Sequence, residues 1–365
     1  MLRVMPIGRA LYGLFWLLIV PSVRAELQAL DDEALRTFTG QAYVAIDQNR
    51  WDDRDYVRVN LGMTIKTQLN VDKLTLGEYP RYENGGACAG CSGLETGLEQ
   101  NPADIMIDNF SLGTIAEKDG IASDGQFYRK GEIVPFTLID PYLEYAIEPD
   151  GTPVGVRMGF KGAQGTLGGE ILSLTGNLPV EIRDTASALR NAPNRPWWID
   201  LAGAILGRTP VASQAELVRP PVVLNGQSDY STGGTLDPVR ASWVGIPDGA
   251  PFSIGPIFLL GTIHFNTDHC NLFGIPTCFP LTNFKSINIG ERQRDDTYKP
   301  VEGLFASFQT KAMSWYNPEN AQSTPTTQGA FLNIPEGGVQ LTLDEAFSGL
   351  PRQRVEYIDR GVGLF

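Results

Sequence analysis

Residues 57–66 read VRVNLGMTIK, and every odd position in this stretch holds an apolar side chain. The residues between them include Arg58, Asn60 and Thr64, which are polar. A period of two is typical of a β-strand with one buried and one solvated face. We therefore expect a half-buried strand here, and this stretch decides the fold because the same pattern recurs along the chain.

The alternation returns twice, at 154–160 and at 257–265. Shorter candidate strands follow the same rule and lie at 105–112, 142–147, 178–182, 303–310 and 339–343. The turn at 149–153, PDGTP, predicts a hairpin between 142–147 and 154–160. Alternating strands favour antiparallel pairing, because parallel strands covered on both faces read as continuous apolar runs. The sequence predicts an all-β fold of mainly antiparallel sheets, sandwich-like or elongated.

A few short helices interrupt the strands. Residues 31–36 place acids in a first helical turn, and 197–207 form an apolar stretch that ends at Gly207. Thr342 and Glu345 have the spacing of a capping box. With 40 Gly and 25 Pro residues, the chain is expected to turn often and to build no long helix.

The beginning of the chain has the pattern of a signal peptide over residues 1–25. Arg3 and Arg9 flank the start, the apolar core is 11–20, and Val23 and Ala25 stand at the third-last and last positions before the expected cleavage. A core of this length is too short to span a bilayer, which needs about 20 residues. We expect an exported chain without a transmembrane helix, located in the periplasm, in the outer membrane or at the cell surface.

Beyond residue 25 the chain divides into an N-terminal β-rich region, 26–190, a proline-rich connection or elaboration, 191–230, and a C-terminal β-rich region, 231–365. One continuous domain is the alternative interpretation. The formal net charge of −13 argues against nucleic acid and against an anionic membrane surface as partners, because both require a basic patch.

Four cysteines form two pairs, Cys88 with Cys91 and Cys270 with Cys278. An even number of cysteines in an exported protein predicts disulfides, either two local loops or two cross-links between the pairs. A zinc site with four thiolates and a redox-active pair at Cys88 and Cys91 are the alternatives. The glycines around that pair favour a loop rather than the helix N-terminus of a redox site.

Oxygen ligands gather before the best strand and are weak candidates for calcium binding. They are Asp47, Asn49, Asp52, Asp53 and Asp55. Their spacing is not that of an EF-hand, and a solvated turn explains them better.

The two histidines, His264 and His269, lie on either side of Asp268. In an extended segment, His264 and Asp268 point to one face and His269 to the other, which argues against a shared metal site. The aromatic residues Trp197, Trp198, Trp243, Trp315 and Tyr316 could form a sugar-binding platform, although core packing explains them better.

No nucleophile elbow, phosphate loop or HExxH zinc motif occurs in the sequence. We therefore expect a protein that is not an enzyme and that uses no cofactor. A hydrolase built on two carboxylates leaves no linear motif and stays open.

The segment LDDEAL at 30–35, followed by TGQAYVAID at 39–47, resembles the beginning of the mature Fil-type pilus-system proteins of Gram-negative bacteria. Residues 143–144, 155–160, 165–167 and 174–176 are similar to the middle of the same family. Tyr43 stands where this family has glycine, and the two cysteine pairs are not part of its pattern. The resemblance implies a β-rich envelope or surface protein connected with filament assembly, and it transfers no catalytic residues.

These observations predict a structural or assembly component of the bacterial cell surface, associated with a pilus or filament. Exposed sheet edges would allow strand addition by other envelope or filament proteins, or by a further copy of the chain in a homo-oligomer. The alternative is a periplasmic module with an apolar cavity between sheets for a lipid or small molecule.

Overall fold

The computed structural model describes residues 44–79, 103–224, 227–229, 233–317 and 321–356. The described residues belong to one compact unit. Their strands pair almost entirely in antiparallel ladders, with short parallel contacts, and helices are few and short. The predicted all-β fold is confirmed. Among the described residues, no helix is long and apolar enough to cross a membrane.

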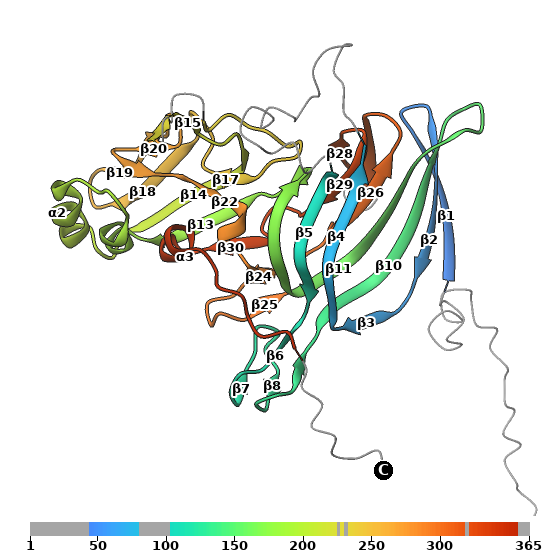
Figure 1. The fold of residues 1–365 in the computed structure, drawn as a ribbon, viewed down its shortest axis with the longest axis horizontal. Helices are drawn as coiled ribbons and strands as arrows, with labels where there is room; N and C mark the ends of the chain where they lie inside the picture. The colour runs from blue at the N-terminus through green and yellow to red at the C-terminus, as the bar shows by residue number, and fades with distance from the viewer. Residues whose placement is uncertain (1–43, 80–102, 225–226, 230–232, 318–320, 357–365) are drawn as a thin grey trace, which may run out of the picture. The chain divides into compact units, whose positions relative to one another are not determined.

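The larger sheet has eleven strands in the described part of the chain (Figure 1). Its main order is β1-β2-β10-β11-β26-β29-β12, with β3 beside β10, β5 and β23 beside β11, and β4 beside β5. These strands are β1 (Val44–Trp51), β2 (Arg54–Leu61), β3 (Thr64–Thr67), β4 (Leu69–Glu78), β5 (Ala103–Leu112), β10 (Phe136–Ile147), β11 (Pro153–Leu174), β12 (Gly176–Asn177), β23 (Ser286–Ile289), β26 (Phe305–Gln309) and β29 (Gly329–Asn333).

The second sheet has seven described strands in the order β19-β18-β14-β13-β30, and β17 joins β14 to β22. They are β13 (Val180–Thr185), β14 (Pro210–Val218), β17 (Trp243–Gly245), β18 (Pro251–Ile257), β19 (Gly261–Asn266), β22 (Cys278–Pro280) and β30 (Val339–Leu341). Strand β13, which precedes residues 191–230, pairs with β14 inside that segment and with β30 after it.

Short hairpins and helices complete the described fold. The two-stranded pairs are β6 (Thr114–Ile115) with β9 (Ile133–Val134), β7 (Gly120–Ile121) with β8 (Phe127–Tyr128), β15 (Val222–Leu224) with β16 (Gln227–Asp229), β20 (Asn271–Leu272) with β21 (Ile275–Pro276), β24 (Glu291–Arg292) with β25 (Tyr298–Lys299), and β27 (Met313–Asn317) with β28 (Gln322–Thr326). The helices are the 3-10 helices η3 (Ala186–Asn191) and η5 (Leu281–Asn283), and α2 (Trp197–Ile205) and α3 (Leu343–Ser348).

Local sequence signals account for several of these elements. The predicted hairpin is β10–β11, closed by the turn around Gly151. Helix α3 begins with the predicted capping box, in which Thr342 Oγ1 accepts from Glu345 N at 3.1 Å and Glu345 Oε2 accepts from Thr342 N at 2.7 Å. The helix expected at 31–36 lies outside the described residues.

Two predicted strands are interrupted by turns, although the alternating sequence pattern continues through them. The stretch 57–66 divides after Leu61 into β2 and β3, and both halves still pair with β10. The stretch 257–265 is not one strand, because residues 258–260 form the turn of the β18–β19 hairpin. An apolar residue can occupy a turn without breaking the alternation, so periodicity alone did not locate these turns.

Strand β11 connects two parts of the larger sheet. Its first half pairs with β10 and β26, and its second half pairs with β5 and β23. Gly165 lies where the partners change and has a φ of 139°, and a Cβ there would stand 2.8 Å from the Cα of Phe136. Only glycine fits this close approach and this backbone conformation.

Three apolar clusters are buried in the described residues, and the smallest of them surrounds Val218, Cys270 and Cys278. The main cluster includes Ile107, Phe136, Leu174, Val180 and Leu217 and lies between the two sheets. The second cluster covers one face of the larger sheet, beneath the β27–β28 hairpin. It consists of Tyr56, Ala146, Val154, Phe305, Met313, Trp315 and Phe331. We call this covered face of β1, β2, β10, β11 and β26 the inner face, and the opposite face the outer face.

Candidate functional site

The inner face buries charge where the sequence predicts an apolar contact. Arg58, Glu144 and Arg157 are at most 4% exposed, while Met158, next in sequence, is 52% exposed. The sequence pattern predicts that Val57, Val59 and Leu61 face the core. That orientation is wrong, because the hairpin β27–β28 covers the other face of the sheet. It encloses the side chains that alternate with these three apolar residues.

The three buried charges lie side by side in one row across three strands. Glu144 stands directly opposite Arg58 on β2 and Arg157 on β11. Arg58 Nε donates to Glu144 Oε1 at 3.0 Å, and Arg157 Nε donates to Glu144 Oε2. The row continues to Asp47 on β1, so its charges alternate in sign. This arrangement pairs each guanidinium with a carboxylate, as burial of charge requires.

Aromatic rings and carbonyl groups hold the two guanidinium groups in place. The Cζ of Arg58 lies 4.2 Å from the centre of the Tyr142 ring, and the Cζ of Arg157 lies 5.0 Å from that of Trp315. Arg157 Nη2 donates to the carbonyl oxygen of Tyr316 at 2.6 Å. Cation–π contacts of this kind gain strength when water is excluded. The inner face is therefore a polar layer enclosed by aromatic residues.

The predicted aromatic platform does not form as one surface. Trp315 is fully buried, and Tyr316 stacks on Trp51 at 5.5 Å between ring centres. Trp197 and Trp198 lie on α2, and Trp243 packs beside Cys270 and Cys278.

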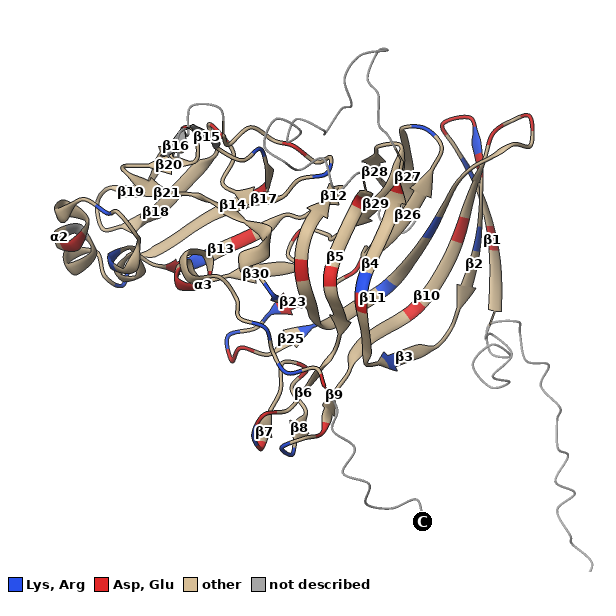
Figure 2. Cartoon of the chain, in the orientation of Figure 1, with Lys and Arg blue, Asp and Glu red and all other residues tan. Residues whose placement is uncertain are grey.

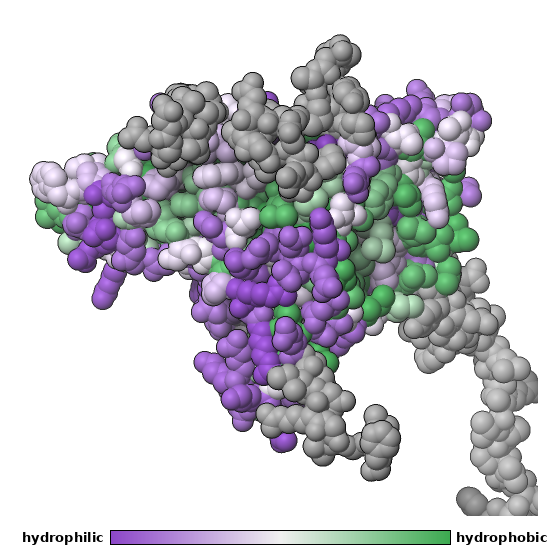
Figure 3. All heavy atoms as spheres, in the orientation of Figure 1, coloured by the Kyte–Doolittle hydropathy of each residue, from purple (hydrophilic) through white to green (hydrophobic). Residues whose placement is uncertain are grey.

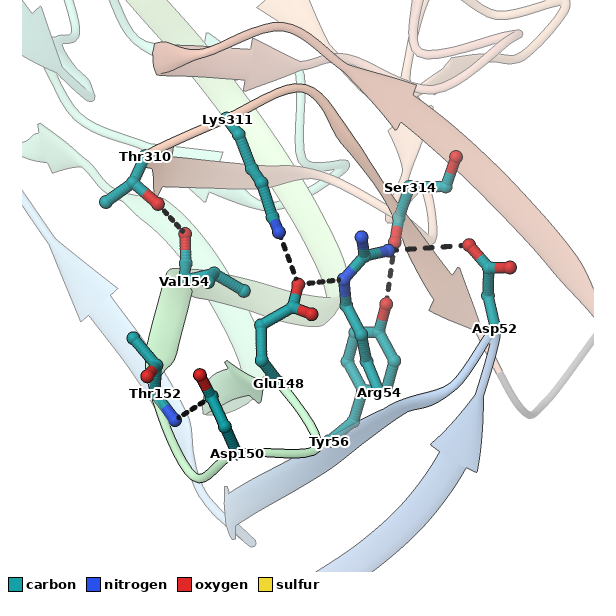
Figure 4. A network of polar contacts seen from close by, with 10 residues as sticks. All are labelled: Asp52, Arg54, Tyr56, Glu148, Asp150, Thr152, Val154, Thr310, Lys311 and Ser314. Carbon is teal, nitrogen blue, oxygen red and sulfur yellow. Dashed lines mark hydrogen bonds and ion pairs between the residues drawn. The ribbon is translucent and has the colours of Figure 1, made fainter.

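A second polar network closes the end of the sheet where the hairpins turn (Figure 4). Glu148 Oε1 accepts from Lys311 Nζ at 2.7 Å and from Arg54 Nε at 2.8 Å. The Tyr56 hydroxyl donates to the carbonyl oxygen of Ser314 at 2.9 Å. Hydrogen bonds from Lys311 and then Arg54 lower the pKa of Glu148, while burial raises the pKa of Tyr56. This network joins β2, the β10–β11 turn and the beginning of β27.

The outer face is apolar across five strands. One row of direct neighbours runs from β1 to β26 and consists of Ile46, Val59, Leu143, Met158 and Ala306. The adjacent row on this face, from β2 to β26, is Val57, Tyr145, Val156 and Phe308. Ile46 is 65% exposed, and Leu143, Tyr145, Met158 and Phe308 are each more than a third exposed. Continuous apolar surface of this kind marks an interaction site.

Charged residues border the outer face where these strands end. Arg50 and Asp55 form an exposed pair at 3.8 Å at the tip of the β1–β2 hairpin. Figure 2 shows charged residues at the tips of the hairpins, and Figure 3 shows hydrophobic residues reaching the surface over the larger sheet. The apolar outer face thus has a polar boundary at this end.

A cleft of about 690 Å³ lies between the inner face and the second sheet. Tyr142 and Arg157 line it from the larger sheet, and Glu216 lines it from β14. Residues 322–325 of β28 form another part of its wall. Two neighbouring hollows, of about 330 and 450 Å³, share Glu336 with the cleft, and we call the three together the groove.

The groove is acidic. Arg183 pairs with Glu181 at 2.9 Å, and Arg157 is held by Glu144. Glu216, Glu302 and Glu336 also line the groove, and within the described residues none of them has an ion-pair partner. They come from chain segments far apart in sequence, so no linear motif could have found them.

One hollow among the described residues is lined only by apolar residues, among them Ile107, Leu174 and Ile287, and has a volume of about 10 Å³. That volume holds about one water molecule.

One predicted disulfide is present, and it forms a local loop. Cys270 and Cys278 are bonded, with 5.1 Å between their Cα atoms, and both are buried beside Val218. This pairing excludes the cross-linked arrangement and the four-thiolate zinc set. Cys88 and Cys91 lie outside the described residues, so the prediction for them stays open.

The five calcium candidates do not converge on one point. Asp47 accepts from Asn60 Nδ2 at 2.6 Å on the inner side of the β1–β2 hairpin, near Asn49. Asp52 and Asp53 form the turn, and Asp55 faces Arg50. Alternation along two strands sends neighbouring oxygens to opposite faces.

In the described residues, a different group of possible metal ligands lies close together. Asp248, Asp268 and His269 place one ligand atom each within 4.8 Å of the others. However, His269 Nδ1 faces Asp248 and Nε2 faces Asp268, each at 3.5 Å, which is the geometry of an imidazole between two acceptors. His264 lies apart, with Nδ1 at 2.8 Å from Ser253 Oγ.

Comparison with known proteins identified no relative of this chain. No protein-family model matches the chain, and no similar protein was found among curated proteins or solved structures. The resemblance to Fil-type proteins therefore stays an expectation.

Proposed function

We propose that this chain is an exported, non-enzymatic assembly component of the bacterial cell envelope, and that the outer face of its larger sheet is the surface through which it assembles. The observation that carries the proposal is the inversion of that sheet. Charged residues occupy the inner face, and two apolar rows cover the outer face. Burying such a surface against a neighbouring subunit removes apolar area from water, at about 25 cal/mol per Å².

The edge of the same sheet supports this proposal. Strand β1 pairs only with β2 among the described strands, and most of its residues are exposed. An unpaired edge beside an apolar face allows a partner to extend the ladder and the apolar surface together. The sequence pattern of residues 1–25 and the Cys270–Cys278 disulfide support an oxidising compartment outside the cytoplasm.

The test combines association with location. Leu143→Ser with Met158→Ser makes two adjacent positions of the outer face polar. The matched control is Ile121→Ser with Phe127→Ser, on the β7–β8 hairpin, where both side chains are exposed but lie off that face. Sedimentation of the purified exported chain should show oligomers for wild type and control, and monomers for the outer-face variant.

Protease treatment of intact cells tests the location. Loss of the wild-type chain from whole cells, or its recovery in sheared filaments, supports a surface component. Release of a strictly monomeric chain by osmotic shock would overturn the proposal and favour a periplasmic binding module.

A further inference from the structure

The wall of the cleft contains a free strand edge. Strand β28 pairs only with β27 among the described strands, and residues 322–325 line the cleft consecutively. A whole run of neighbouring residues can line one hollow only where the strand presents its edge or lies along the wall. An edge in a cleft is a place where another strand can be added.

The direction of the free backbone groups follows from the contacts of β27. The carbonyl oxygen of Ser314 accepts from the Tyr56 hydroxyl, and that of Tyr316 accepts from Arg157, so both point away from β28. Ser314 and Tyr316 stand opposite Pro325 and Ser323. These are therefore non-hydrogen-bonded pairs, in which the β28 backbone also points outward.

Pro325 is consistent with this assignment. Proline has no N–H to donate, so it is found in sheets at edge positions that face away from the paired strand. The outward groups of β28 are then the N–H and C=O of Ser323 and the C=O of Pro325. Along the strand these are one donor followed by two acceptors, so an added strand would accept from Ser323 N–H and donate to the two carbonyl oxygens.

The charge of the groove selects the partner. Glu216, Glu302 and Glu336 line the cleft, and Glu336 also borders both neighbouring hollows. The basic residues that line the groove are already paired: Arg157 with Glu144, Arg183 with Glu181, and Arg292 with Glu345. The groove therefore has an excess of negative charge along its length, which favours a cationic chain over a neutral or acidic one.

We infer that the cleft binds an extended, basic polypeptide segment, which adds as a strand to the free edge of β28 while its lysine or arginine side chains meet Glu216, Glu302 and Glu336. This inference is independent of association through the outer face, because the groove lies on the inner side of the sheet.

The first test uses a labelled ten-residue peptide of alternating lysine and threonine, titrated into the purified full chain. The triple variant Glu216→Gln, Glu302→Gln, Glu336→Gln should weaken binding by about tenfold, because each rim charge contributes a modest attraction. The matched control, Asp72→Asn, Glu117→Gln, Glu356→Gln, removes the same charge from exposed positions outside the groove and should change binding by less than about twofold. Equal losses in the two triples, or no binding to wild type, would overturn the inference.

The second test addresses the backbone. Two versions of the peptide carry N-methyl groups at alternate residues, in the two possible registers. Strand addition exposes only one set of N–H groups to β28, so one register should lose about tenfold in affinity and the other should bind nearly as the parent does. Equal binding by both versions would show that side chains alone are recognised and would overturn the strand-addition step. Near-ultraviolet circular dichroism verifies that each protein variant is folded.

Discussion

The two sheets of this chain place their residues in opposite ways. In the second sheet, Val211 and Leu217 on β14 are buried, while Gln214 and Glu216 face the groove. In the larger sheet, Arg58 on β2 is buried, and Leu143 on β10 is exposed. Both sheets alternate with period two, so periodicity identifies the faces but does not say which face is covered.

The consequence is that the sheets depend on different forces. The second sheet is stabilised by apolar burial and by a disulfide near its edge. The larger sheet shares this apolar core through residues such as Ile107 and Leu174, but its middle also depends on a buried ion row, and the apolar residues of its outer face are left available for association. Each of the following predictions tests this difference.

The largest effect is expected at Glu144. Glu144→Ala leaves Arg58 and Arg157 buried without their shared carboxylate and should lower the free energy of unfolding by about 4 kcal/mol. Chemical denaturation measures this loss. Glu170→Ala is the control on the neighbouring strand, because Glu170 pairs with Lys285 at the surface and should cost less than about 1 kcal/mol. Similar costs for the two variants would mean that the ion row does not stabilise the sheet.

Two leucine truncations compare the apolar residues of the two sheets directly. Leu217→Ala removes a side chain that is 3% exposed and should cost about 3 kcal/mol. Leu143→Ala, at 37% exposed, should cost less than about 1 kcal/mol in the dilute monomer. Denaturation at several protein concentrations measures both. If Leu143 were as costly as Leu217 in the monomer, the outer face would not be a free surface.

The disulfide should contribute somewhat less than a core leucine. Replacing both Cys270 and Cys278 by alanine opens a loop with a sequence separation of 8 and should lower the free energy of unfolding by about 2.5 kcal/mol. Denaturation of the double variant measures the loss. Alkylation of the unreduced native protein is the control, and modification of Cys270 or Cys278 there would contradict the local pairing.

The smallest effect is a pH dependence at the end of the larger sheet. Contacts with Lys311 and Arg54 lower the folded-state pKa of Glu148 below its ordinary value of 4.5. Its contribution to stability is therefore complete above that value and is lost as the pH falls through the lower folded-state pKa. Unfolding measured from pH 7 to pH 3 should show a shallower loss for Glu148→Gln than for wild type. Asp237 is the control. Burial raises its pKa, so its contribution to stability changes with pH in the opposite direction.

Much of the fold follows from local pattern. The β10–β11 hairpin, the Thr342 capping box and the strands at 105–112 and 303–310 are each set by side chains close together in sequence. The ends of strands were less predictable, because apolar residues also occupy the turn at 258–260.

The candidate site could not be predicted in the same way. Arg58, Glu144 and Arg157 meet through pairing between distant strands, and their burial depends on the β27–β28 hairpin far along the chain. The one available signal is a single charge between apolar neighbours on each of three strands. Such a charge fits a solvated face equally well, so the sequence leaves the choice open.

The long strand β11 has a consequence for the order in which the chain can be completed. Its partners include β5, which begins at Ala103, and β26, which ends at Gln309. The ladder beside β11 therefore stays unfilled until most of the polypeptide has emerged from the ribosome. Non-local pairing of this kind also closes slowly. The middle of the chain therefore cannot complete its sheet until the last third has been made, which would suit the export that we propose.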